Sequence, residues 1–216
     1  MASKSHRERI YQMFLARIRA GEIGREDRLI DNAIGAELGV SRMPVRDALM
    51  RLTHEGYLVA TTRGFMLPAL SMRRVREIFE IRRLLEPRAV GQATIAMTTD
   101  QIESIAVAVD GARIAIREQD IQALYRTSEL VRSGWLGAVP SDELREAISR
   151  YLIQVQSVRM GTMRDPAVQR VVVDGQARML AAFRARDAFA AADEMLRFIL
   201  AAEQSYVALT DDGDAA

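Results

Sequence analysis

The spacing of apolar residues before residue 57 predicts three helices. Apolar side chains recur at four-residue intervals from Ile10 to Ile18, which is typical of the buried face of a helix, here predicted over residues 6–20. The same periodicity predicts a short helix over residues 31–38 and a longer one over residues 41–55. A glycine follows each of these segments and favours helix termination there.

Two short strands are predicted directly after the third helix. Residues 57–60 and 65–69 are mostly apolar, and they flank a turn over residues 61–64. The resulting order is two helices, a tight turn, a third helix and a hairpin. This order is typical of a winged helix-turn-helix. We therefore predict such a domain over residues 1–70.

From residue 71 onward the pattern is helical almost to the end of the chain. Ser71 is a candidate N-cap, and Thr98 with Gln101 matches a capping box. Pro87 lies inside the first of these helices and predicts a kink. A break is also predicted near Asp187. Further helices are expected over residues 102–116, 120–135, 142–160, 166–184 and 185–209.

These helices define a mostly α-helical fold class with two domains. An all-α bundle is predicted over residues 71–209, after the winged helix-turn-helix of residues 1–70. Residues 210–216 are small and acidic, and we expect them to form a disordered tail.

Composition narrows the class of protein. The chain has no cysteine, which excludes disulfides, thiolate metal sites and cysteine nucleophiles. No apolar segment approaches the roughly 20 residues of a membrane-spanning helix, and the N-terminus lacks the apolar region of a signal peptide. We therefore expect a soluble cytoplasmic protein with no membrane partner. Residues 1–70 carry 11 Arg and Lys against 8 Asp and Glu, whereas the rest carries 19 against 21. This mild asymmetry points to the N-terminal part for any contact with nucleic acid.

The sequence around the start of the third helix has the residues that a helix-turn-helix needs. Gly39 can adopt the left-handed backbone conformation of a sharp turn. Ser41 can cap the third helix by accepting a hydrogen bond from the backbone N–H of Met43. Pro44 falls in the first helical turn, where its missing N–H costs little.

Arginines stand where such a domain contacts DNA. Arg42, Met43 and Arg46 lie at the N-terminal end of the third helix, where a recognition helix contacts base edges and phosphates. A guanidinium can bind guanine or phosphate through two hydrogen bonds. Arg63 and Gly64 add charge and an accessible backbone at the predicted hairpin tip. The alternative is an ordinary three-helix unit with solvated arginines.

The run from Ile10 to Pro68 resembles the GntR family of winged-helix regulators. The segments that carry the resemblance are Ile34-Gly35-Ala36-Glu37-Leu38-Gly39-Val40-Ser41-Arg42, Pro44-Val45-Arg46-Asp47-Ala48-Leu49, Glu55-Gly56-Tyr57-Leu58 and Arg63-Gly64-Phe65. The resemblance implies that the third helix and the hairpin tip contact a double-stranded DNA operator. The residues that it places at DNA are Asn32, Ser41, Arg42, Met43, Pro44, Arg46, Arg63 and Gly64. Asn32 stands where the family often has Arg, so a weaker contact is expected there.

The remainder resembles the FCD-type ligand domain of that family, a bundle of six or seven helices. The matching segments are Ile81-Arg82-Arg83-Leu84-Leu85-Glu86-Pro87 and the stretch from Ala182 to Met195. Many such domains hold a divalent metal through an Asp and three His. The matching positions here are Tyr125, Glu129, Gln176 and Phe198.

The residues at these positions do not suit a metal. Both histidines of the chain, His6 and His54, lie in the N-terminal part, so the bundle has no imidazole ligand. We expect no metal and no other cofactor. A buried Glu129 would then need an Arg partner, a hydrogen-bond network or solvent beside it.

Arg82 and Glu86 are four residues apart on one predicted helix. One interpretation is an ordinary ion pair between helical neighbours. The other, implied by the resemblance, is that Arg82 points into the bundle and binds a carboxylate effector. The predicted effector pocket comprises Arg82, Tyr125, Glu129, Gln176 and Phe198.

Together these features predict a homodimeric repressor or activator that binds a pseudo-palindromic operator and responds to a small metabolite such as an organic acid. Two alternatives stay open. The pocket could be vestigial, or the chain could be a helical enzyme with an accessory DNA-binding domain. Residues 71–216 contain neither His nor Cys and no Gly-rich phosphate loop, which disfavours the enzyme.

Overall fold

The computed structural model describes residues 2–19, 22–24, 26–68, 71–154 and 162–211. It divides the chain into two compact units. Among the described residues, the first comprises those from 2 to 71 together with 152–154, and the second comprises 72–151 and 162–211. No helix in the described ranges has the length and apolar character needed to cross a bilayer.

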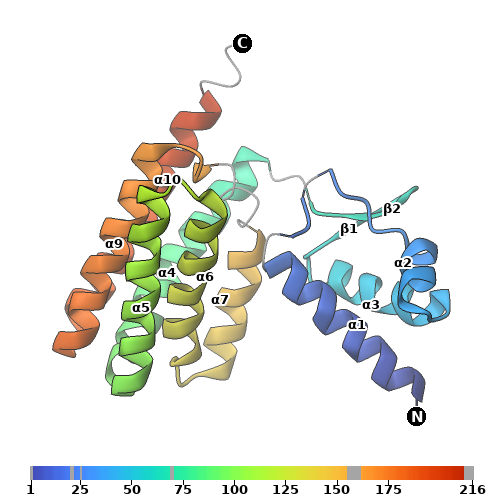
Figure 1. Cartoon of the computed structure of the whole chain (residues 1–216), viewed down its shortest axis with the longest axis horizontal. Helices are drawn as coiled ribbons and strands as arrows, with labels where there is room; N and C mark the ends of the chain where they lie inside the picture. Colours follow the sequence, from blue (N-terminus) through green and yellow to red (C-terminus); the bar gives the residue numbers. More distant parts are fainter. Residues whose placement is uncertain (1, 20–21, 25, 69–70, 155–161, 212–216) are drawn as a thin grey trace. The chain divides into compact units, whose positions relative to one another are not determined.

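The first unit is the winged helix-turn-helix that the sequence predicted (Figure 1). Its elements are α1 (Ala2–Arg19), α2 (Asp31–Leu38), α3 (Arg42–His54), β1 (Val59–Thr61) and β2 (Gly64–Met66). The two strands are antiparallel, with Thr61 opposite Gly64 and Thr62-Arg63 between them. The hairpin is therefore tighter than predicted.

The first predicted strand starts too early because the chain turns into the core after α3. The backbone N–H groups of Tyr57 and Leu58 both donate to the carbonyl of Leu52, at the end of α3. Their side chains are buried. These two residues therefore finish the helix instead of joining the sheet, and the strand pairing is confined to residues 59–66.

The core of this unit lies between α1, α3 and the hairpin. Its buried members on α1 and α3 are mostly the apolar stripes on which these helices were predicted, and they include Ile10, Phe14, Ile18, Val45, Ala48, Leu49 and Leu52. Polar side chains at the end of α3 also interact with α1. The hydroxyl of Tyr11 donates to Glu55 at 2.5 Å, and Arg51 lies over the Tyr11 ring while donating to Glu55. Burial, together with donation to Glu55, raises the pKa of Tyr11 above its ordinary value.

The turn between α2 and α3 follows the predicted chemistry in one residue and departs from it in another. Gly39 is left-handed (φ 64°), and its N–H closes the end of α2. Ser41 has the extended backbone of an N-cap, but its side chain accepts no hydrogen bond from the helix. The expected bond from Met43 is therefore absent. Because Ser41 is exposed, water can accept hydrogen bonds from the first backbone N–H groups of α3.

Gly64 is required by packing against the segment before α2. Leu29 and Phe65 exchange two backbone hydrogen bonds, of 2.7 and 2.9 Å. A Cβ on Gly64 would lie 2.6 Å from the Leu29 carbonyl oxygen, and its φ of 119° also disfavours other residues. Packing against Leu29 is therefore one reason for a glycine here, and the approach of its backbone to DNA stays a prediction.

The second unit is a helical bundle. Within its described residues the helices are α4 (Met72–Ala96), α5 (Thr99–Arg117), α6 (Ile121–Gly137), α7 (Asp142–Gln154), α9 (Pro166–Ala185) and α10 (Ala188–Asp211). Helix α4 packs against α10 and α6, and α5 packs against α6 and α9 (Figure 1). The facing positions of α5 are mostly small or β-branched, which lets these helices approach closely.

Most of these helices begin and end where the sequence predicted. Thr98 and Gln101 form the capping box, and Asp165 caps α9 by accepting from the N–H of Ala167. Arg186 is left-handed (φ 55°) and separates α9 from α10, close to the predicted break. Helix α4 continues through Pro87.

The C-terminal prediction needs a correction. Helix α10 extends to Asp211, so residues 210 and 211 are helical and do not belong to a disordered tail. The rest of that predicted tail lies outside the described residues. So do residues 155–160 of the predicted helix over residues 142–160, of which α7 accounts for the first part.

Candidate DNA-contacting surface and effector cavity

The N-terminal end of α3 presents three of the predicted DNA-contacting residues to solvent. Arg42 and Arg46 have half-exposed side chains, and Met43 is 63% exposed. The opposite face of α3, from Val45 to Leu52, is fully buried against the core. This burial fixes the rotation of the helix, so that positions 42, 43 and 46 face outward together.

A carboxylate on α2 joins the two arginines. Nε of Arg42 donates to Oδ2 of Asp31 at 2.9 Å, and Nη1 of Arg46 reaches the same oxygen at 3.4 Å. The other carboxylate oxygen accepts from the backbone N–H of Asn32. Asp31 is only 7% exposed. Its burial alone would raise its pKa, but the hydrogen bonds and charges of Arg42 and Arg46 outweigh burial and lower the pKa below its ordinary value.

Sequence reasoning missed Asp31. The residue stands 11 and 15 positions before the arginines, so no helical spacing connects them. An acidic residue in the first turn of a helix is already explained by the helix dipole. Only the packing of α2 against α3 brings its carboxylate beneath the two guanidinium groups.

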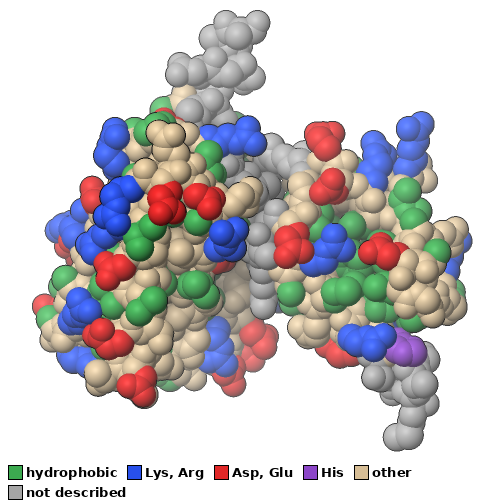
Figure 2. All heavy atoms as spheres, viewed as in Figure 1, with side chains coloured by type: hydrophobic (Ala, Val, Ile, Leu, Met, Phe, Trp, Pro, Cys, Tyr) green, Lys and Arg blue, Asp and Glu red, His purple; other side chains and the backbone are tan. Residues whose placement is uncertain are grey.

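The other predicted DNA-contacting residues lie on the turn, on α2 and on the hairpin. Ser41 and Asn32 are exposed, and Pro44 is half-buried in the first turn of α3. Arg63 is exposed at the hairpin tip, whereas Gly64 is half-buried against Leu29. Figure 2 shows basic side chains projecting where the hairpin lies.

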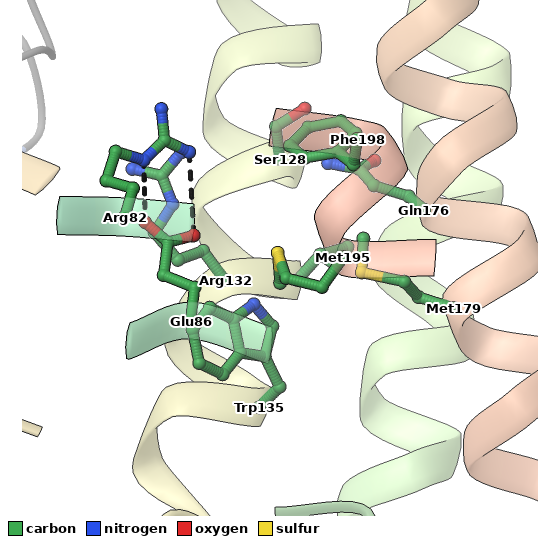
Figure 3. A pocket seen from close by; sticks show the side chains of 10 residues that line it. Arg82, Glu86, Ser128, Arg132, Trp135, Gln176, Met179, Met195 and Phe198 are labelled. Atoms are coloured by element: carbon green, nitrogen blue, oxygen red, sulfur yellow. Dashed lines mark hydrogen bonds and ion pairs between the residues drawn. The ribbon is translucent and has the colours of Figure 1, made fainter. Parts of the chain in front are cut away.

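The bundle contains a hollow, part of it open to solvent, lined from α4, α6, α9 and α10. Three of its lining residues belong to the predicted effector pocket: Arg82 on α4, Gln176 on α9 and Phe198 on α10 (Figure 3). The apolar part of the lining comes from Val131, Trp135, Met179 and Met195. Helix α6 contributes residues 128, 131, 132 and 135, which share one helical face.

Arg82 forms the ion pair of the first interpretation and also points into the bundle, while its binding of a carboxylate effector stays a prediction. Its guanidinium lines the hollow, and it is paired with Glu86 through Nε–Oε1 at 2.6 Å and Nη2–Oε2 at 3.5 Å (Figure 3). Both residues are buried, at 4% and 2% exposure. The guanidinium also lies 5.0 Å from the ring centre of Phe79. A buried pair of this kind is costly to break, because either partner alone would be an unpaired buried charge.

Tyr125 and Glu129 do not line this hollow. Tyr125 lies one helical turn before Glu129 on α6 and is buried in an apolar cluster with Met163 and Val172. Glu129 forms an ion pair with Arg132 at 3.3 Å, which is the first of the three surroundings that the sequence left open for this carboxylate. The predicted pocket therefore needs correction at these two positions.

Two residues that the sequence did not single out, Ser128 and Arg132, also line the hollow. Glu86 belongs with them, since it was considered only as a partner of Arg82. In the sequence, each of these three residues is a polar position within the apolar stripe of a helix. Helix α6 has several such positions. Among the described residues no group of three or more His, Cys, Asp or Glu is placed to hold a metal ion.

Two domain models match this chain. Residues 6–65 match the bacterial regulatory proteins of the gntR family, and residues 77–201 match the FCD domain. The chain belongs to the GntR family of transcription regulators, in its FCD-type group. GntR regulators bind DNA operators.

Curated relatives are regulators too. The HTH-type transcriptional regulator McbR of Escherichia coli (strain K12) is 29% identical over 168 residues, which cover 74% of this chain and 74% of McbR. The Nta operon transcriptional regulator of Aminobacter aminovorans is 38% identical over 77 residues. That alignment covers 35% of this chain and 37% of the Nta regulator. The chain therefore matches only about a third of the latter protein.

Solved structures show the same fold. Escherichia coli McbR/YncC superposes with a TM-score of 0.81 at 22% identity, covering 96% of this chain and 98% of that chain. A GntR regulator from Rhodococcus sp. RHA1 gives 0.78 at 19% identity, covering 94% and 98%. At these identities the likeness concerns the fold.

Proposed function

We propose that this FCD-type regulator binds its operator as a homodimer through Arg42 and Arg46, and that a small metabolite bound in the bundle changes the affinity for DNA. The observation that carries the DNA contact is the Asp31 carboxylate. It holds both guanidinium groups at the exposed end of α3. An arginine oriented in advance loses less conformational entropy when it binds a base or a phosphate.

Substitution of each arginine tests the DNA contact. The target is a duplex selected from random DNA by the wild-type protein. Arg42→Ala and Arg46→Ala should each lower the slope of log affinity against log salt by about 1 if a phosphate contact is lost. Loss of a base contact should cost about 1–3 kcal/mol and relax sequence preference. Arg113→Ala on α5 removes the same charge from the bundle and should leave binding unchanged. Wild-type binding by both α3 variants would refute the assignment.

The dimer follows from the geometry of operators. A single recognition helix reads too few bases for specificity, and two-fold symmetric dimers read two half-sites about one helical turn apart. Light scattering on the free protein and on the DNA complex should therefore give two chains per operator. A monomer at micromolar concentration that binds one chain per site would contradict this proposal.

The effector is supported by the polar lining of the hollow. A vestigial pocket would be expected to fill with apolar side chains, because a buried polar atom without a partner costs free energy. Here Ser128 Oγ and Gln176 Oε1 are buried and have no hydrogen-bond partner among the described residues. Both line the hollow, which favours a ligand over a vestigial pocket.

A further inference from the structure

Ser128 differs from other hydroxyl residues in the helices of the bundle. Thr94, Thr127 and Ser205 each donate to the carbonyl four residues earlier, at 2.7–2.9 Å. Ser128 makes no such bond, although it is 1% exposed. Its hydroxyl is therefore available to the hollow that it lines (Figure 3).

Gln176 offers a second buried polar atom to the same hollow from α9. The residue is 4% exposed, and its Oε1 has no hydrogen-bond partner among the described residues. The Gln176 amide and the Ser128 hydroxyl can both be satisfied by one ligand group that donates and accepts hydrogen bonds. A hydroxyl does both, and it serves either end of the Gln176 amide.

The charges that line the hollow are already paired. Arg82 is neutralised by Glu86 at 2.6 Å, and Arg132 by Glu129 at 3.3 Å. A carboxylate ligand would have to displace Glu86 or add one uncompensated negative charge to the site. Either event buries a charge without a partner, which is strongly unfavourable. An uncharged ligand avoids this cost.

Further room for an apolar group lies next to this hollow. Arg82 and Phe198 also line a second, partly open hollow, together with Phe79, Thr162, Met163, Val168, Val171, Val172 and Ala202. Phe198 is held close to α9 because residue 175 is a glycine: a Cβ there would lie 2.6 Å from Cδ2 of Phe198. Apart from Arg82 and Thr162 the lining of the second hollow is apolar, and Phe198 lines both hollows.

We propose that the effector is an uncharged molecule with a hydroxyl group, bound by Ser128 and Gln176, and an apolar body that packs against Phe198. This inference rests on the proposed function, and it narrows the effector from small metabolites in general to alcohols and phenols. It replaces the organic acid that the sequence suggested, because the arginine on which that expectation depended is paired with Glu86.

Matched ligands test the chemical class. Each set has one apolar skeleton with a hydroxyl, a carboxylate or an ammonium group, for example 2-phenylethanol, phenylacetate and phenethylammonium, or 1-hexanol, hexanoate and hexylammonium. Binding to the full chain is measured by saturation-transfer NMR and calorimetry. We expect the hydroxyl member to bind at least about tenfold more tightly than the carboxylate member, since an unpaired buried charge is disfavoured.

Variants test the site. Ser128→Ala and Gln176→Leu should each weaken binding of the hydroxyl member by about two- to tenfold, the value of one hydrogen bond. Gln92→Leu is the matched control, because Gln92 Oε1 is also buried without a partner among the described residues but does not line this hollow. It should leave binding unchanged. Without ligand, Gln176→Leu should keep or raise the melting temperature. If it fails to fold, Ser128→Ala, which removes one oxygen, provides the test.

The outcomes separate this inference from the proposed function. The inference is overturned if the carboxylate member binds more tightly than the hydroxyl member. It is also overturned if neither Ser128→Ala nor Gln176→Leu weakens binding of the hydroxyl member, or if no member binds. The same samples are titrated with the selected operator. Failure of the wild type to bind any selected duplex would overturn the DNA-binding proposal, while a preference for the hydroxyl member would still support the ligand class.

Discussion

Replacement of Asp31 by asparagine tests whether Asp31 affects DNA binding by orienting Arg42 and Arg46 or only through its negative charge. Asn has nearly the same size and can still accept one hydrogen bond, but it cannot hold two guanidinium groups by charge. The lost interactions are one bond of 2.9 Å and one of 3.4 Å, from side chains that are half exposed. Allowing for that exposure, we expect the free energy of unfolding to fall by about 1–2 kcal/mol.

The effect on DNA should differ between specific and random sequences. Removal of a negative charge strengthens non-specific binding and steepens the salt dependence by up to about 0.9 in slope. Loss of orientation should lower the affinity for the selected operator, relative to that for a scrambled duplex, by about tenfold or about 1.4 kcal/mol. This is within the range of one bidentate base contact. Both affinities are measured by fluorescence anisotropy at several salt concentrations.

Asp47→Asn is the control for this prediction. Asp47 is exposed on α3, next to Arg46 in the sequence, and its replacement changes the net charge equally. It should strengthen both affinities together and keep their ratio. If Asp31→Asn does the same, Asp31 is only a nearby negative charge, and the reasoning from orientation is wrong.

The pH dependence of stability provides a second measurement on Asp31. Its pKa is lowered in the folded protein, so the folded state favours the ionised form. The stability that this provides is fully present above the unfolded pKa of about 4 and is lost as the pH falls through the folded pKa. Urea unfolding of the wild type and of Asp31→Asn should differ at pH 7 and converge as the pH falls below 4. A difference that persists at low pH would contradict the ion pair.

Two further predictions concern the bundle. Gly175→Ala should lower the free energy of unfolding by about 1–3 kcal/mol, because the new Cβ would clash with Phe198. Gly137→Ala, with no atom within 4 Å of the new Cβ, should be neutral or stabilising in urea unfolding, and equal effects of the two variants would refute this packing. EDTA should change neither melting temperature nor operator affinity, and elemental analysis should find less than one transition metal per chain. One tightly bound metal in the bundle would show that the matching of Tyr125, Glu129, Gln176 and Phe198 to the family's ligand positions is mistaken.

Local signals in the sequence determined the elements. The apolar stripe of each helix and the capping box at Thr98 depend on residues three or four positions apart, so the chain itself records them. The turn at Gly39 follows from backbone sterics at one residue. The same local reasoning was wrong at Ser41 and at Tyr57. At Tyr57 the first strand was placed too early, because tertiary packing gave its backbone a different partner.

The candidate sites needed the tertiary structure. The sequence pointed to the arginines of α3 and to Arg82, Gln176 and Phe198. It did not indicate that Asp31 lies beneath the arginines or that Ser128 and Gln176 line the same hollow. Nor did it decide whether Arg82 was paired or free. These relations depend on the rotation and register with which helices pack, and those are set by the fit of many side chains over long separations in the chain. The sequence by itself therefore determined the elements and the family, and helix packing decided which polar groups are paired and which are left for a ligand.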